Sequence, residues 1–267
     1  NRFKDNVLRH QVDTERLKYK IDELVDKCER TELAIPDFQR FFVWEKDQIS
    51  AFFDSILNGL YIGSLLFWEP SEQKIGLSPI RGVKSDNILG NQIILDGQQR
   101  VTSIFYALRS PDYKLKGDER CFFYINFKVY LKEEEESERI ITFTKELDPE
   151  DQFSKLFFPL NRLEHYGDWI RDWEDFMNQK HPKLDYHSEV KPIARIMDTK
   201  LRHMLEEFGI PHVTLKKTHL NEVIEIFERI NTSGTKLTVF DLLIAKLSLL
   251  LKVCKQTLEF WEALQPF

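Results

Sequence analysis

The sequence predicts an α+β protein in which a small mixed β-sheet is surrounded by many helices and the C-terminal part is mainly helical. Short apolar runs of strand length are interspersed along the chain with longer stretches of helical periodicity. The chain has 267 residues, of which 42% are hydrophobic and 31% charged, the composition of a globular protein with a substantial core. No internal repeat or long linker divides it.

The first part of the chain is expected to contain two helices and a strand-like segment. Residues 13–30 have the apolar spacing of a helix. Pro36 interrupts the next segment, so residues 35–44 are interpreted as a strand or an ordered loop. A second helix is expected over residues 49–57 and should end at Gly59, because glycine commonly terminates helices.

The middle of the chain contains a strand that leads directly into a helix. Residues 65–68 predict a short strand, and residues 70–91, which contain Pro, Gly, Ser and Asn, predict a loop. The apolar run at 93–95 predicts a buried strand, and the helix after it has an apolar stripe within residues 101–108. Residues 121–131, rich in aromatic and β-branched side chains, are interpreted as another strand.

The second half of the chain is expected to be mainly helical. The acidic run at 133–136 predicts a solvated loop, residues 150–208 predict helices and residues 210–215 a strand. Two last helices are expected over residues 219–230 and 239–253.

These elements divide the chain into a sheet-containing core, residues 1–131, and a mainly helical extension, residues 132–267, that completes the same domain. The sequence begins without Met and stops just after an apolar helical run. We therefore expect it to be the N-terminal part of a longer protein.

Charge and cysteine content restrict the function classes. The net charge is −6, whereas a protein that binds nucleic acid through charge alone is basic, so contact with DNA would have to be local or shape-based. No apolar run reaches the roughly 18 residues of a membrane span, and no signal peptide opens the chain. Cys28, Cys121 and Cys254 are odd in number and far apart, which argues against a disulfide framework and favours a reducing cytoplasm.

Several common catalytic motifs are absent from the sequence. It contains no P-loop of the form Gly-x-x-x-x-Gly-Lys-Ser/Thr, no His-Glu-x-x-His zinc motif and no Gly-x-Ser-x-Gly nucleophile elbow. The 7 histidines are scattered, and His203, His212 and His219 do not have the spacing of metal ligands. The absence of the first of these motifs excludes a P-loop NTPase.

The segment Asp96-Gly97-Gln98-Gln99-Arg100 lies between a predicted strand and a predicted helix. A strand, a glycine turn and a helix start form an anion-binding geometry, because the free N–H groups and the helix dipole favour negative charge. Gly97 permits a tight turn and a close approach of a ligand to the backbone. Arg100 in the first turn opposes the dipole by about 0.3–1 kcal/mol, and becomes favourable when a phosphate lies between the helix start and the guanidinium.

The same segment has a purely structural interpretation. Asp96 with Gln99 three residues later fits a capping box, a pattern that needs no ligand. Arg100 and the two adjacent glutamines favour ligand binding, because they direct several polar groups to one place.

Residues 35–44 contain a second group of candidate site residues. Asp37, Gln39 and Arg40 are embedded among aromatic side chains, a mixture typical of a pocket with a few fixed donors. Two alternatives stay open: a strand edge with Arg40 in a surface ion pair, and aromatic residues that simply belong to the core. The aromatic residues of this segment are Phe38, Phe41, Phe42 and Trp44.

Residues 227–235 contain a third candidate segment. Asn231 and Gly234 supply turn and helix-ending chemistry, and Thr238 with Asp241 fits a capping box for the next helix. A joint between two helices therefore explains this segment without a functional role.

Four stretches, taken in order, resemble the N-terminal domain family of the GmrSD restriction endonucleases, which is found also in phosphorothioate-sensing defence proteins. They are IPDFQRFFVW at 35–44, GLYIGSLLFWE at 59–69, ILDGQQRVTSIFYAL at 94–108 and FERINTSGTKLTVFDLLIAKL at 227–247. Their order and spacing match the family and span most of the chain.

The resemblance implies a fold related to ParB and sulfiredoxin, in which a Gly-x-x-Arg turn at a helix start holds nucleotide phosphates. Gly97 and Arg100 match that pattern within the core of residues 1–131. It also implies hydrolysis of a nucleoside triphosphate (NTP) coupled to DNA cleavage by a separate His-Asn-His (HNH) nuclease module. No HNH motif occurs in these 267 residues.

On this resemblance we assign roles in a site that uses an NTP and Mg²⁺. Asp96, Gln98 and Arg100 are the expected catalytic residues, and Asp96 would hold Mg²⁺ or orient the attacking water. Phosphate contacts are expected from Gly97, Gln98, Gln99 and Arg100. Further nucleotide contacts are expected from Gln39, Arg40 and Asn231.

The resulting hypothesis is an NTP-binding and NTP-hydrolysing sensor and regulatory domain of a modification-dependent, anti-phage restriction protein. Its expected partners are modified DNA and the HNH nuclease, and self-association into a homo-oligomer stays open. Two alternatives also stay open: a non-enzymatic module that reads modified DNA or a nucleotide signal, and a ParB-like nuclease.

Overall fold

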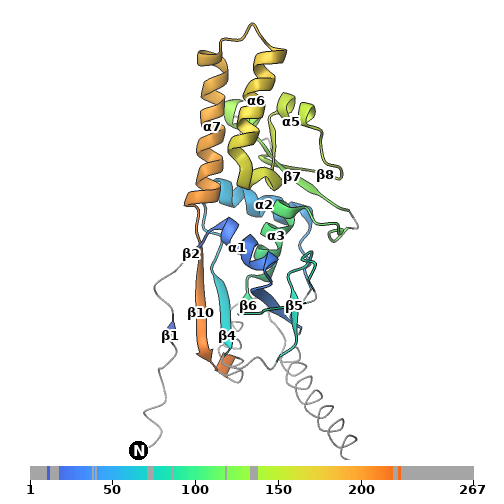
Figure 1. The fold of residues 1–267 in the computed structure, drawn as a ribbon, viewed down its shortest axis with the longest axis vertical. Helices are drawn as coiled ribbons and strands as arrows, with labels where there is room; N and C mark the ends of the chain where they lie inside the picture. The colour runs from blue at the N-terminus through green and yellow to red at the C-terminus, as the bar shows by residue number, and fades with distance from the viewer. Residues whose placement is uncertain are drawn as a thin grey trace, which may run out of the picture.

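The computed structural model describes residues 11–12, 18–37, 39, 41–70, 75–85, 87–117, 119–132, 138–218 and 222–223. Over these ranges the fold is α+β, which confirms the predicted fold class. A larger mixed sheet, a smaller antiparallel sheet and several helices make up the described part (Figure 1).

The larger sheet has the strand order β1-β10-β4-β6-β3-β5, and β2 also pairs with β10. Its strands are Gln11–Val12 (β1), Lys18–Tyr19 (β2), Leu33–Pro36 (β3), Leu65–Pro70 (β4), Leu77–Pro79 (β5), Gln92–Asp96 (β6) and Ile210–Thr218 (β10). Strand β10 is parallel to β4, and β3 is parallel to β6, whereas β4 and β6 are antiparallel. A strand from the second half of the chain therefore pairs beside strands from the first half.

Side chains of the central strands alternate between two apolar clusters. Phe67 and Ile94 belong to the large core shared with the helices, while their neighbours Trp68, Ile93 and Leu95 belong to a second cluster. Successive side chains of a strand point to opposite faces of a sheet. Both faces are buried here, which explains why the sequence of β6 is a continuous apolar run.

Three helices contribute apolar stripes to the large core: Ile21–Glu29 (α1), Lys46–Leu57 (α2) and Gln98–Arg109 (α3). The predicted end of α2 at Gly59 is confirmed. Gly59 has a φ of +67°, its N–H donates to the Ile56 carbonyl at 2.9 Å, and the Leu60 N–H donates to the Ser55 carbonyl at 2.9 Å. This pair of hydrogen bonds is a Schellman motif, and it fixes the direction in which the chain leaves α2.

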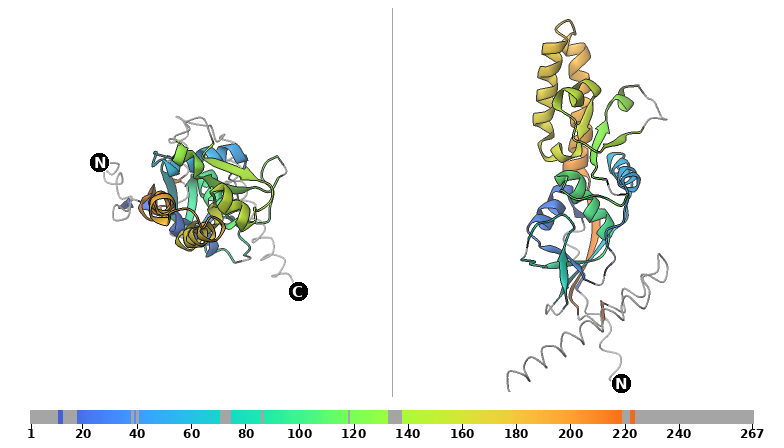
Figure 2. Two further views of the ribbon diagram at one scale, coloured as in Figure 1. Left: turned by 90° about the horizontal axis from the view of Figure 1, so that it is seen from above. Right: turned by 90° about the vertical axis from the view of Figure 1, so that its right-hand side faces the viewer.

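The remaining elements form an upper layer (Figures 1 and 2). The smaller sheet has the antiparallel order β8-β7-β9, and helices α6 and α7 pack as a hairpin that stands beyond α1, α2 and α3, away from the larger sheet. The elements of this layer are Phe122–Asn126 (β7), Lys128–Lys132 (α4), Ile140–Phe143 (β8), Pro149–Lys155 (α5), Phe157–Pro159 (β9), the 3-10 helix Leu160–His165 (η1), Tyr166–Lys180 (α6), the π-helix Tyr186–Val190 (η2), Lys191–Arg202 (α7) and the π-helix His203–Glu207 (η3).

Several predicted elements have different bounds in the structure, and two of them change their type of secondary structure over part of the predicted length. The first helix begins at Ile21, because Lys18 and Tyr19 pair with β10 as a strand. The strand expected over residues 121–131 ends at Asn126, whose Oδ1 accepts a hydrogen bond from the Lys128 N–H at 3.2 Å and so starts the helical turn α4.

Two further predictions missed strands. The expected loop at 70–91 contains β5, which pairs with β3, and the expected helical region at 150–208 is interrupted by β9, which pairs with β7. Both strands are only three residues long, too short to give a periodic signal. The acidic run at 133–136 and, apart from residues 222–223, the two last expected helices lie outside the described residues.

Two of the three cysteines, Cys28 and Cys121, lie in the described part of the chain, and Cys254 lies outside it. Cys28 and Cys121 are buried, free thiols, and burial raises the pKa of each thiol, so neither is a thiolate nucleophile. Among the described residues, no group of three or more His, Cys, Asp or Glu side chains could hold a metal ion. None of the described helices combines the length and the apolarity needed to cross a bilayer.

Candidate functional site

The predicted junction of strand, glycine and helix is present at residues 96–98. Strand β6 ends at Asp96, Gly97 has a φ of +96°, and α3 begins at Gln98. A β-carbon on Gly97 would clash with the side chain of Leu65 on the neighbouring strand β4. Glycine is therefore required here by the left-handed backbone and by the close packing of β4.

Among the described residues, no side chain caps the first turn of α3. The capping box expected from Asp96 and Gln99 is not formed, because the N-cap residue is Gly97. The first turn of α3 also contains no acidic residue. In α1 and α2, by contrast, the N-cap N–H donates to a side chain of the first turn, Glu23 in α1 and Gln48 in α2, and each first turn contains at least one acidic residue. The first N–H groups of α3 are therefore available to an anion.

Arg100 connects the motif to a neighbouring loop. Its Nη2 donates to Oδ2 of Asp96 at 2.9 Å, and its Nη1 donates to the carbonyl of Ile62 at 3.1 Å. The Arg100 side chain is 15% exposed, whereas that of Asp96 is 60% exposed. The anion that Arg100 was expected to need near the helix start is supplied in the structure by Asp96.

Gly63 lies against the same guanidinium. Its φ is +85°, and a β-carbon added to it would lie 2.6 Å from Nη1 of Arg100. One added to Gly97 would lie 3.3 Å from Nη2 of Arg100. Two glycines with positive φ thus leave the space that the guanidinium fills. Neither Ile62 nor Gly63 was predicted as a site residue, although both belong to the stretch 59–69 that carries the family resemblance.

Gln99 holds the loop that precedes α2. Its Oε1 accepts hydrogen bonds from the backbone N–H groups of Val43 at 2.9 Å and Trp44 at 3.2 Å, and its Nε2 donates to the carbonyl of Phe41 at 3.2 Å. Both ends of the side-chain amide are thus bonded to this backbone, and one N–H of Nε2 is left over. Gln99 can also offer a ligand its own backbone N–H group at the helix start.

The other two glutamines of the candidate set differ in their contacts. Nε2 of Gln39 donates to the carbonyls of Ile94 at 2.6 Å and Leu95 at 2.9 Å, so Gln39 lies at the end of β6 next to the motif. Gln98 is partly exposed, and its side chain forms no hydrogen bond with the described residues. Arg40 and Asn231 lie outside the described residues.

The aromatic residues at 41–44 have different environments. Phe42 is buried in the core, and Trp44 packs edge-on against Phe52 with ring centroids 5.6 Å apart. Phe41 is 84% exposed. The core interpretation therefore holds for Phe42 and Trp44, and Phe41 alone of these three projects into solvent.

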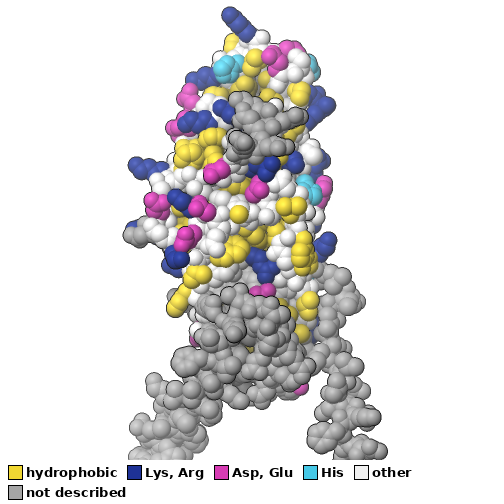
Figure 3. Space-filling model, turned by 180° about the vertical axis from the view of Figure 1, so that it is seen from behind, with side chains coloured by type: hydrophobic (Ala, Val, Ile, Leu, Met, Phe, Trp, Pro, Cys, Tyr) yellow, Lys and Arg dark blue, Asp and Glu magenta, His cyan; other side chains and the backbone are white. Residues whose placement is uncertain are grey.

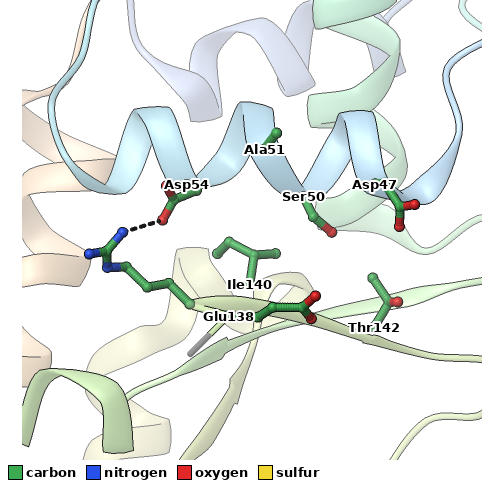
Figure 4. A pocket seen from close by; sticks show the side chains of 8 residues that line it. Asp47, Ser50, Ala51, Asp54, Glu138, Ile140 and Thr142 are labelled. Atoms are coloured by element: carbon green, nitrogen blue, oxygen red, sulfur yellow. Dashed lines mark hydrogen bonds and ion pairs between the residues drawn. The ribbon is translucent and has the colours of Figure 1, made fainter. Parts of the chain in front are cut away.

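A surface hollow lies elsewhere, between α2 and β8 (Figure 4). Nη1 of Arg139 lies 3.5 Å from Oδ1 of Asp54 across it. Its lining side chains come from α2, from β8 and from the two residues before β8, and are Asp47, Ser50, Ala51, Asp54, Glu138, Arg139, Ile140 and Thr142. None of the predicted site residues within the described part of the chain lines this hollow.

A family model described as the N-terminal domain of the GmrSD restriction endonuclease matches residues 21–248. The chain belongs to this family. The matched range runs from α1 through β10 and includes the motif at residues 96–100, so the Arg100 contacts are part of the GmrSD N-terminal domain. Three of the four stretches that carried the resemblance lie mostly in the described residues, and the fourth, 227–247, lies outside them.

A relative of this GmrSD N-terminal domain is an uncharacterized protein of Methanocaldococcus jannaschii, which is 29% identical over 264 residues. The similar region covers 90% of this chain and 43% of the relative. The chain thus spans less than half the length of that relative.

Proposed function

We propose that this GmrSD N-terminal domain binds and hydrolyses an NTP at the start of α3 and uses the nucleotide to regulate DNA restriction. In this proposal it senses modified DNA, and NTP turnover is coupled to DNA cleavage by an HNH nuclease in another domain or subunit. Membership of the GmrSD family supports an association with a restriction system.

The observation that carries the proposal is the open first turn of α3. The turn follows a left-handed glycine, lacks a side-chain cap and lacks an acidic residue. Asp96, Gln98 and Arg100 surround it with one carboxylate, one unengaged amide and one cation. Backbone N–H groups, a helix dipole and a guanidinium at one point are the groups that bind phosphates. The same geometry supports the proposed relationship to the ParB and sulfiredoxin fold.

Arg100 is proposed to meet the phosphates by exchanging one partner. Its Nη2 bonds to Asp96, an exposed carboxylate, while Nη1 bonds to the carbonyl of Ile62. A phosphate at the helix start replaces Asp96 on Nη2 and leaves the bond to Ile62 in place. Because phosphate carries more charge and more acceptor oxygens than the carboxylate, the exchange favours the bound state.

Asp96 fits a Mg²⁺ ligand that acts together with a nucleotide. Only its Oδ2 accepts from Arg100, and the side chain is 60% exposed. Mg²⁺ in NTP sites is bound through one or two carboxylates and the substrate phosphates, so a single aspartate suffices. The ion, when bound, neutralises charge that develops on the phosphates. Asp96 either holds this ion or orients the attacking water.

The remaining candidate residues have proposed roles that follow from their contacts. Gln98 has an unengaged side chain and is proposed to orient water or a phosphate oxygen. Gln99 contributes its backbone N–H, and Gln39 supports the end of β6. Arg40 and Asn231 stay proposed nucleotide contacts.

Local recognition of DNA is supported by the distribution of charge. Over the described part of the face in Figure 3, Lys and Arg side chains are interspersed with Asp and Glu side chains. With the net charge of −6, this pattern favours the reading of a modified group over a long row of phosphate contacts. The free thiols Cys28 and Cys121 support the proposed cytoplasmic location.

A non-enzymatic nucleotide switch is a second candidate, and the pair of Arg100 with Asp96 favours it. A nucleotide that only displaces Asp96 changes the contacts of Arg100, and through Ile62 the loop before β4, without any chemical step. Binding alone would then carry the signal to the nuclease.

The test measures NTP binding, phosphate release and plasmid nicking side by side on the full chain with Mg²⁺. We expect binding and phosphate release without nicking. Binding without phosphate release supports the switch, and nicking by this chain alone contradicts the assignment of cleavage to a partner. The same assays on Arg100→Ala test the role of Arg100. Arg202→Ala is the control for this variant, because Arg202 also forms an i,i+4 pair, with Asp198 at 2.8 Å on α7.

A further inference from the structure

The most exposed apolar side chains of the described structure gather on two loops beside the candidate site. Phe41 is 84% exposed, Tyr61 is 77% exposed and Leu60 is 55% exposed. Val43, on the same loop as Phe41, is 48% exposed. Among the described residues, no other large apolar side chain is more than half exposed. Exposed apolar side chains gathered in one region of a surface indicate a contact with another molecule.

The motif itself holds both loops. Gln99 makes three hydrogen bonds to the backbone of residues 41–44, and Arg100 bonds to the carbonyl of Ile62, next to Tyr61. The Schellman motif at Gly59 fixes the other end of the second loop. Phe41 and Tyr61 are thus exposed rings on anchored backbone, and adjacent residues of one helical turn place them.

We propose that Phe41 and Tyr61 are the base-stacking residues of the nucleotide site. This inference rests on the proposed function, in which the start of α3 binds the phosphates. A nucleotide has a charged phosphate end and a flat, apolar base, and the structure puts flat, exposed rings on the loops next to the open helix turn. Stacking on Phe or Tyr uses the π-face that every base has.

The anchored backbone of the two loops favours binding of a nucleotide to these rings. Rings on a fixed backbone lose little freedom when a ligand binds, which improves affinity. Because Gln99 and Arg100 place the loops, the ring positions depend on the residues that also lie at the phosphate site. Stacking without base-edge hydrogen bonds also predicts similar affinities for ATP and GTP.

The test compares ligands with and without a base. Isothermal titration of the full chain uses non-hydrolysable ATP and GTP analogues and inorganic tripolyphosphate, with wild type, Phe41→Ala, Tyr61→Ala and the double variant. We expect each single variant to lose about fivefold or more in affinity for both NTP analogues, the lower end of the effect of removing a stacking ring. Affinity for tripolyphosphate should be unchanged. Tyr61→Phe should retain binding, because it keeps the ring.

Leu89→Ala is the matched control, because Leu89 is 46% exposed on a different loop and should change neither affinity. Undiminished NTP affinity in the double variant contradicts the inference and leaves the proposed function standing. An equal loss for tripolyphosphate also contradicts it, because the rings then act only by supporting the loops. A wild-type chain that binds neither ligand overturns the proposed function together with the inference.

Discussion

The backbone of Gly63 packs directly against the guanidinium of Arg100. A β-carbon at position 63 would lie 2.6 Å from Nη1 of Arg100, and the same Nη1 donates to the carbonyl of Ile62, one residue earlier. The loop before β4 therefore approaches the guanidinium as closely as a residue without a side chain permits. Through this pair, a ligand that moves Arg100 also acts on the loop that carries Tyr61.

Gly63→Ala should destabilise the fold and disturb Arg100. The left-handed backbone alone costs an alanine about 1–2 kcal/mol, and the overlap with the guanidinium adds to this cost. Urea denaturation measures the free energy of unfolding. Gly117→Ala is the control for the backbone term, because Gly117 has a φ of +105° and nothing within 4 Å of an added β-carbon. Equal losses in the two variants would show that Arg100 moves aside without cost.

Arg100→Ala is expected to weaken NTP binding by about 1.5–3 kcal/mol, the range for a hydrogen bond to a charged group. It should also lower stability by about 1 kcal/mol, because the Ile62 carbonyl loses its donor. Arg100→Lys keeps the charge but not the planar fork that spans Asp96 and Ile62, so its affinity should be intermediate. Titration calorimetry and urea denaturation measure the two effects. Unchanged NTP affinity in both variants would leave Arg100 a purely structural residue.

Asp96→Asn should separate binding from hydrolysis. The variant loses a carboxylate for Mg²⁺, so NTP hydrolysis should fall strongly. It also weakens the competitor for Nη2 of Arg100, because a neutral amide oxygen is a poorer acceptor from a guanidinium than a carboxylate, so NTP affinity without Mg²⁺ should be equal or higher. Stability should change by less than about 1 kcal/mol, because the pair with Arg100 is largely exposed on the Asp96 side.

The control for this variant is Asp198→Asn, which removes another i,i+4 pair, with Arg202 at 2.8 Å, on α7. Phosphate release over a range of Mg²⁺ concentrations is the measurement. Intact hydrolysis in Asp96→Asn, together with a lower melting temperature, would show that Asp96 is structural and that the catalytic assignment is wrong.

The junction at the start of α3 could be predicted from the sequence because its signals are local. The apolar run of β6, the glycine and the apolar stripe of α3 are contiguous, and each has a direct physical meaning. The contacts that Gln99 and Arg100 make with the two loops could not be predicted. Their partners at residues 41–44 and at Ile62 lie 38 to 58 positions away in sequence, and the contacts are made to backbone atoms, which no residue type reveals.

The failed capping box has a related cause. The pattern of Asp96 and Gln99 is correct for a cap, but the helix begins one residue later than the pattern requires, after Gly97. The Gln99 side chain instead accepts a hydrogen bond from the loop before α2, and the Asp96 carboxylate accepts one from Arg100. The tertiary contacts outweigh a local preference of about 1 kcal/mol.

Gln99→Ala should loosen the loop at residues 41–44. Without the Oε1 acceptor, the amides of Val43 and Trp44 should exchange with solvent about 5- to 10-fold faster, which corresponds to a hydrogen bond of about 1–1.5 kcal/mol. Hydrogen exchange resolved by residue measures this. Gln98→Ala is the matched control, since the adjacent glutamine forms no side-chain hydrogen bond with the described residues. Unchanged exchange in Gln99→Ala would mean that other contacts hold the loop.

Binding of modified DNA should depend only weakly on salt. The net charge is −6, and the face in Figure 3 mixes positive and negative side chains, so few phosphates can be neutralised at once. Each neutralised phosphate contributes about −0.9 to the slope of log K against log salt concentration. Recognition of a modified group in a small pocket therefore predicts a shallow slope and a clear preference for modified over plain duplex. Titrations of both duplexes at several salt concentrations measure the two quantities. A steep slope with equal affinities would remove the sensor role from this chain and assign it to a partner.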